Sequence, residues 1–122
     1  MPAKAKFRIA IKPNGDAVVR PPNDVCEKGA GAKSVWFRNL TAGRAHVSVP
    51  GGVFDKQLPA NVADPAMVYV LEPKDAPGNA DTLELPVLAA PTVGGVFSFK
   101  VFCEESFSFA QGNSDPEFII EN

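Results

Sequence analysis

The chain has 122 residues, of which 45% are hydrophobic and 21% charged, a size and composition typical of one globular domain. Its 10 glycines and 12 prolines interrupt the backbone often enough to exclude long helices. Twelve Lys and Arg against fourteen Asp and Glu give a net charge of -2, and no basic stripe of the kind that binds nucleic acid is visible. We therefore expect a single domain over residues 1–122 and no nucleic-acid partner.

The first residues do not form a targeting signal. Charged residues interrupt every apolar run between Met1 and Lys12, whereas a secretory signal needs a continuous apolar run of roughly 7 to 15 residues. No segment approaches the roughly 20 apolar residues that cross a bilayer. The sequence predicts no membrane association and a cytoplasmic chain as given. A mature periplasmic or secreted form, from which a signal was removed, also fits.

Short apolar segments separated by turn residues predict strands along the whole chain. Phe7–Ile11 alternates apolar and polar residues, and Pro13–Asp16 after it is typical of a tight turn. Pro21 and Pro22 cannot donate backbone hydrogen bonds, so they indicate a sheet edge or a crossing point. The predicted strands are Phe7–Ile11, Ala17–Arg20, Asp24–Glu27, Ser34–Asn39, Ala45–Val49, Met67–Leu71, Thr82–Val87, Val96–Cys103 and Glu117–Glu121.

The clearest alternation is in Val96–Cys103, where Phe97, Phe99 and Val101 share one face. Trp36, in the middle of a predicted central strand, is expected to lie in the core. Many short strands separated by Gly, Pro and Asn residues predict an all-β fold, either an antiparallel β-sandwich or a Greek key barrel.

Residues that could carry chemistry are few. Two cysteines, Cys26 and Cys103, and one histidine, His46, are too few for a four-ligand structural zinc site. Whether the two cysteines form a disulfide or remain buried free thiols stays open. A Cys–His nucleophile pair is imaginable, but no surrounding motif supports it, and Glu104 and Glu105 are adjacent rather than paired across a site. The sequence therefore predicts that the protein is not an enzyme.

The order of features resembles a known family. A strand ending in Asn39 precedes His46, a later strand ends in Cys103, and one further strand closes the chain. This order is similar to that of the cupredoxin, or blue-copper, family. The resemblance implies a cupredoxin-like Greek key β-sandwich of seven or eight mostly antiparallel strands. The matching segments are Phe37–Asn39, Ala45–Val47, Gly95–Cys103 and Glu117–Glu121.

The resemblance assigns the first copper imidazole to His46 and the copper thiolate to Cys103. A blue-copper centre also needs a second imidazole, and the chain has one histidine. The family's second histidine and its methionine are both absent from Glu104-Glu-Ser-Phe-Ser-Phe-Ala-Gln-Gly-Asn113, although Gln111 is similar to the axial ligand of some members. We therefore expect no copper and no other cofactor. The alternative is a metal-binding, copper-handling protein that uses His46, Cys103 and Gln111.

Two aromatic residues in the same segment, Phe107 and Phe109, are the candidate partner-binding residues. In the cupredoxin fold, the loop after the cysteine lies at the apolar end where redox partners dock. If exposed, the two rings would contact another protein; if buried, they would fill the space that copper otherwise occupies. The sequence predicts a non-catalytic structural or protein-interaction domain. Its partner would be another protein or a second copy of the chain, bound through an exposed edge strand or the loops 42–46, 50–54 and 104–113 at one end.

Overall fold

In the computed structural model, the chain is described over residues 3–29, 31–50, 53–54, 66–87, 94–110 and 115–121. These residues contain no α-helix, so the all-β prediction is confirmed. Nothing helical in these ranges has the length and apolar content needed to cross a bilayer. The elements are β1 (Lys4–Ile11), β2 (Ala17–Arg20), β3 (Asn23–Cys26), β4 (Ser34–Asn39), β5 (Ala45–Pro50), β6 (Ala66–Leu71), the 3-10 turn η1 (Pro77–Asn79), β7 (Thr82–Pro86), β8 (Gly95–Ser98), β9 (Lys100–Cys103), β10 (Ser108–Phe109) and β11 (Glu117–Ile120).

The strands pair in the orders β2-β1-β4-β7, β10-β9-β5-β6 and β3-β11-β8. Six of the eight ladders between described strands are antiparallel, whereas β1 with β4 and β3 with β11 are parallel. The described residues form eleven strands, more than the seven or eight expected. Compared with the nine strand ranges predicted from the sequence, two strands are additional. Phe99 divides one predicted strand into β8 and β9, and the two-residue β10 was not predicted.

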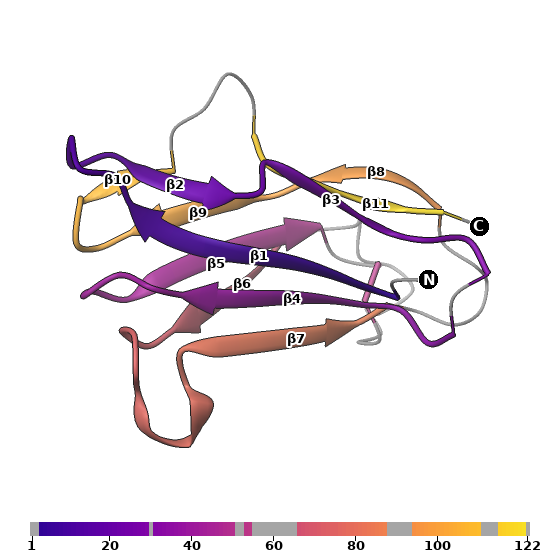
Figure 1. Ribbon diagram of the computed structural model, residues 1–122, viewed down its shortest axis with the longest axis horizontal. Coiled ribbons are helices and arrows are strands. Elements are labelled where there is room, and N and C mark those ends of the chain that lie inside the picture. The colour runs from indigo at the N-terminus through magenta and orange to yellow at the C-terminus, as the bar shows by residue number, and fades with distance from the viewer. Residues whose placement is uncertain are drawn as a thin grey trace.

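The sheets form two layers around one core (Figure 1). Only Phe99 separates β8 from β9, so these strands join the second and third sheets into one layer. Pro21 and Pro22 carry the chain from β2 in the first sheet to β3 in the third, which confirms the predicted crossing point. The Phe99 ring lies 4.8 Å from Phe7 and 5.2 Å from Phe37, both in the first sheet. We call β2-β1-β4-β7 the first layer and the other strands the second layer.

The core contains the inward-facing residues of both layers. Phe99, just before β9, and Val101, within β9, are both buried, as the alternation predicts. The prediction for Trp36 was wrong, because its ring is only partly buried on the outer face of the first layer. Its neighbour Phe37 fills the inner position of β4 instead. Successive residues of a strand face opposite sides, so only one of the two aromatic residues can enter the core.

Candidate functional site

The strands that carry the two candidate copper ligands are direct neighbours, but the ligands themselves are not. In the β5–β9 ladder, Ala45 lies opposite Cys103 and His46 lies opposite Phe102. Directly opposite residues share one face of a sheet, and successive residues alternate between faces. The Cys103 thiol is therefore buried between the layers, whereas the His46 imidazole lies on the outer face of the second layer.

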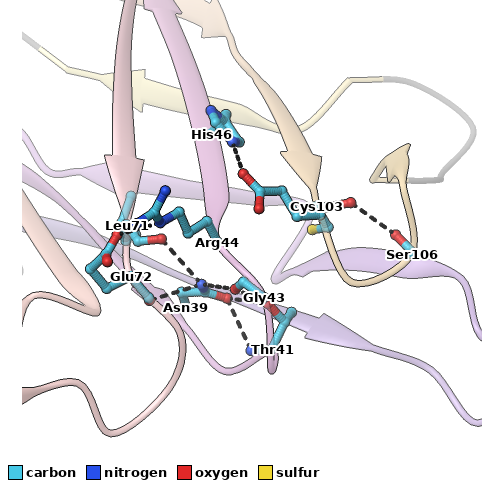
Figure 2. Close-up of polar contacts among 10 residues, drawn as sticks. Asn39, Thr41, Gly43, Arg44, His46, Leu71, Glu72, Cys103 and Ser106 are labelled. Atoms are coloured by element: carbon cyan, nitrogen blue, oxygen red, sulfur yellow. Dashed lines mark hydrogen bonds and ion pairs between the residues drawn. The ribbon is translucent and has the colours of Figure 1, made fainter.

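The His46 ring is held by a carboxylate. Its Nε2 atom lies 2.6 Å from Oε2 of Glu104, the residue that follows β9 (Figure 2). The Glu104 backbone N–H donates to the Arg44 carbonyl at 3.0 Å, which fixes this carboxylate beside the start of β5. In the ranges that the structure describes, no group of three or more His, Cys, Asp or Glu residues is arranged to hold a metal ion. Gln111, the third residue of the copper-handling alternative, lies outside the described residues.

Both cysteines are buried free thiols, which answers the disulfide question. Burial, with a smaller contribution from the nearby Glu105 charge, raises the pKa of Cys103 to about 11. Burial also raises the pKa of Cys26, whose thiol donates to the Ser34 carbonyl at 3.3 Å. A thiolate is the form that attacks substrates and binds metals, so these surroundings suppress both activities.

The Cys103 environment predicts a loss of stability at alkaline pH. Because its pKa rises from 9.0 unfolded to about 11 folded, its contribution is complete below pH 9.0 and is lost as the pH rises through 11. We expect the free energy of unfolding, measured by urea denaturation, to fall by about 2 kcal/mol across this window because of Cys103. In Cys103→Ala, this decrease in the free energy of unfolding should largely disappear. In Cys26→Ala, the decrease that is due to Cys103 should remain. The same fall in wild type and Cys103→Ala would contradict the assignment.

A buried asparagine organises the loop that leads to His46. Asn39, at the end of β4, is fully buried, and its Nδ2 donates to the carbonyls of Gly43 at 2.8 Å and Glu72 at 3.0 Å. The Leu71 carbonyl lies 3.5 Å from the same nitrogen. The Asn39 Oδ1 accepts from the Thr41 N–H at 3.0 Å and from its hydroxyl at 2.7 Å. Figure 2 shows this network, which ties the β4–β5 loop to the end of β6. Asn39 was recognised in the sequence only as a strand end.

The β4–β5 loop packs directly on the turn after β9. The Ala42 N–H donates to the Glu105 carboxylate at 2.6 Å. A Cβ atom at Gly43 would lie only 2.8 Å from the Glu105 backbone nitrogen, so this close approach requires glycine. The turn itself is closed by the Phe107 N–H, which donates to the Glu104 carbonyl at 3.2 Å. The two segments therefore form one connected end of the molecule.

Of the three loops expected at this end, the structure places 42–46 and the described part of 104–113, residues 104–110, there. β5 begins at Ala45 beside the turn after β9 and runs to Pro50 (Figure 1). Six extended residues span roughly 17 Å. The segment after Pro50 therefore starts at the opposite end, where the buried Phe54 pairs with Val87 next to β7. The prediction that 50–54 joins the other two loops was wrong, because a strand carries its two flanking loops to opposite ends.

The two candidate partner-binding residues are exposed. The side chain of Phe107 is 83% accessible and that of Phe109 is 56% accessible, so the interpretation that they fill the interior was wrong. Both rings contact Phe102 edge to face, with centroids 5.6 Å and 5.3 Å away. Phe107 adopts a φ of 49°, in the left-handed region that bulky residues rarely occupy.

These rings continue a row of side chains across the second layer. The register places Val70 opposite His46, His46 opposite Phe102, and Phe102 opposite Phe109, so all four share the outer face. The Phe102 ring lies 6.1 Å from the imidazole, and Val70 is exposed. The same face of β6 also exposes Val68, two residues earlier. We call His46, Val68, Val70, Phe102, Phe107 and Phe109 the outer aromatic patch.

This end of the molecule has a buried thiol on its inner side and an apolar surface on its outer side. The Cys103 thiol is buried with a raised pKa, and the imidazole faces the other way and is engaged by Glu104. The outer aromatic patch is instead contiguous and accessible. Comparison of the chain with models of known protein families and with curated proteins finds no match, so its function is inferred from its own geometry.

Proposed function

We propose that the chain is a non-catalytic, copper-free, cupredoxin-like domain that binds another protein. The direct pairing of β5 with β9 supports the strand arrangement of the family resemblance, and the opposite facing of His46 and Cys103 in this ladder supports the absence of copper. The antiparallel pairing of β4 with β7 and of β5 with β9 skips strands in the sequence, which supports a Greek key topology.

The exposure of Phe107 is the observation that carries the proposed function. A bulky residue in the left-handed region costs on the order of 1 kcal/mol, and an exposed aromatic ring buries little of its own apolar surface. Stability therefore does not explain this residue. Aromatic residues are enriched in the cores of protein interfaces, and apolar patches bounded by polar groups mark such interfaces.

The surroundings of the patch fit a protein partner. A hollow of about 220 Å³ lies beside Phe109, lined in part by Lys100, Asp115 and Pro116. An apolar side chain of a partner would fit this hollow, and the charges of Lys100 and Asp115 would lie at its border. The patch itself combines aromatic rings with the His46–Glu104 pair, which supplies a polar rim.

Site-specific photocrosslinking tests this function. Benzoylphenylalanine would be incorporated at position 107 of the protein expressed in its own cells, with position 28, an exposed site beyond β3, as the matched control. We expect one crosslinked protein from position 107 and none from position 28. A product with the mass of two chains would identify the partner as a second copy. Identical products from both positions, or only uncrosslinked chain from both, would contradict the proposal.

A further inference from the structure

The first layer presents a row of arginines that is not apparent in the sequence. Arg8 on β1 lies opposite Arg20 on β2 and also opposite Arg38 on β4, so the three side chains share the outer face. Lys4 and Lys6 lie on the same face of β1, four and two residues before Arg8. Five of the twelve Lys and Arg thus lie on one sheet face, although the chain has a net charge of -2. The expectation that there is no basic stripe was wrong, because strand pairing assembles one.

Most of these charges are not neutralised within the protein. Lys4 pairs with Glu84 at 3.1 Å, and the Arg38 Nε lies 3.8 Å from Asp81. Over the described part of the chain, no ion pair within 4.0 Å involves Lys6, Arg8 or Arg20. Like charges directly opposite one another destabilise a sheet. The arginine row is therefore not explained by the stability of the sheet.

The row is continuous with an indole ring and a cavity. Trp36 lies on the same face of β4 as Arg38, two residues before it. The Arg8 Cζ atom lies 5.9 Å from the centroid of the Trp36 ring. A cavity of about 520 Å³ opens beside Trp36 and Arg38 and is bordered by Asp75 and Asp81. The Arg38 Nε is buried and has no hydrogen-bond partner among the described residues. Tryptophan and arginine are the residues that most often dominate binding energy in interfaces. We call Lys6, Arg8, Arg20, Trp36 and Arg38 the basic face.

We propose that the basic face docks an acidic, carboxylate-rich segment of a partner protein. Guanidinium groups bind carboxylates through two parallel hydrogen bonds, and three such groups in one row fit a segment with two or three carboxylates. Arg8 and Arg20 are exposed and can reach such a segment. The basic face lies on the opposite layer from the outer aromatic patch, so this docking site is independent of the function proposed above.

The border of the basic face favours a short acidic segment over nucleic acid. Glu84 and Asp81 lie beside it on the β7 side, and Asp24 accepts the Lys6 backbone N–H on the β3 side. A double-stranded nucleic acid carries one charge per roughly 1.7 Å and would extend beyond the row to meet these carboxylates. A segment with few charges would end within the row.

Trp36 provides the readout, because it is the one tryptophan of the chain. The probe is a decapeptide that alternates glutamate with serine and has blocked ends, and the comparison probe alternates lysine with serine. We expect a saturable change in Trp36 emission with the glutamate peptide and none with the lysine peptide. In Arg8→Gln/Arg20→Gln, the affinity should fall by about tenfold, and added salt should weaken binding to wild type. Lys28→Gln, at an exposed position just after β3, should bind within about twofold of wild type.

The same titrations also give the results that would overturn the proposal. The proposal would be overturned by no saturable change with the glutamate peptide, or by an equal loss of affinity in Lys28→Gln. It would also be overturned by tighter binding of a single-stranded oligonucleotide with the same number of charges. Circular dichroism would establish that Arg8→Gln/Arg20→Gln is folded. Arg20→Gln alone, on the edge strand β2, gives a second folded variant that should show part of the loss.

Discussion

Replacing Asn39 with alanine is expected to lower the free energy of unfolding by about 3 to 5 kcal/mol, the largest effect on stability that we predict for a polar residue. The substitution leaves the carbonyls of Gly43 and Glu72 without the amide that now donates to them. It also removes the oxygen that accepts from the buried Thr41 N–H, whereas the Thr41 hydroxyl can still donate to the Gly43 carbonyl at 2.9 Å. A buried polar group without a partner costs about 1 to 3 kcal/mol, and this change creates more than one such group.

The matched control for Asn39→Ala is Asn14→Ala. Asn14 also makes side-chain hydrogen bonds, both with Asp16, but it lies in the exposed turn after β1. Water replaces such bonds, so we expect Asn14→Ala to cost less than about 1 kcal/mol. Urea denaturation followed by tryptophan emission measures both variants. Equal costs for the two variants would show that the Asn39 network does not hold this end of the molecule together.

Replacing Phe107 with glycine and Phe109 with serine is expected to lower the affinity for the crosslinked partner by at least about tenfold. Interface aromatic residues often contribute about 2 kcal/mol or more, so the loss of two should exceed that factor. The fold should remain stable, because the φ of 49° at Phe107 is favourable for glycine, which offsets the lost contact with Phe102. We expect the free energy of unfolding to change by less than about 1 kcal/mol.

Val96→Ser is the matched control for the aromatic double variant. Val96 is an exposed apolar residue on the outer face of β8, away from the outer aromatic patch. We expect Val96→Ser to bind the purified partner with the wild-type affinity, as measured by isothermal titration calorimetry. If Val96→Ser lost as much affinity as the double variant, or if the double variant bound normally, the patch would not be the contact surface.

The strand positions could be predicted from the sequence because alternation and turn residues are local signals. Phe7–Ile11, Ala17–Arg20 and Ser34–Asn39 all coincide with or lie within observed strands. Alternation shows that two faces differ, but in β4 both faces carry an aromatic residue. Which ring enters the core depends on the partner layer, and for this reason Trp36 was misassigned.

The candidate site could be predicted only in part, because its decisive contacts join distant positions. The resemblance assigns His46 and Cys103 to one copper site, but the register of β5 and β9 shows that the two side chains face opposite sides of the sheet. Asn39 binds carbonyls more than thirty residues away, at Leu71 and Glu72. The arginine row likewise comes from three strands whose pairing no local pattern reveals.

A copper titration tests the central claim most directly: that this end of the domain binds a protein rather than copper. The reduced protein would be titrated with copper(I) and copper(II) and followed by absorption spectroscopy and native mass spectrometry, beside Cys103→Ala and the buried-thiol control Cys26→Ala. With the thiol and imidazole on opposite faces, we predict no stoichiometric complex and no thiolate-to-copper charge-transfer band. A one-to-one complex with such a band, lost in Cys103→Ala and kept in Cys26→Ala, would contradict the account.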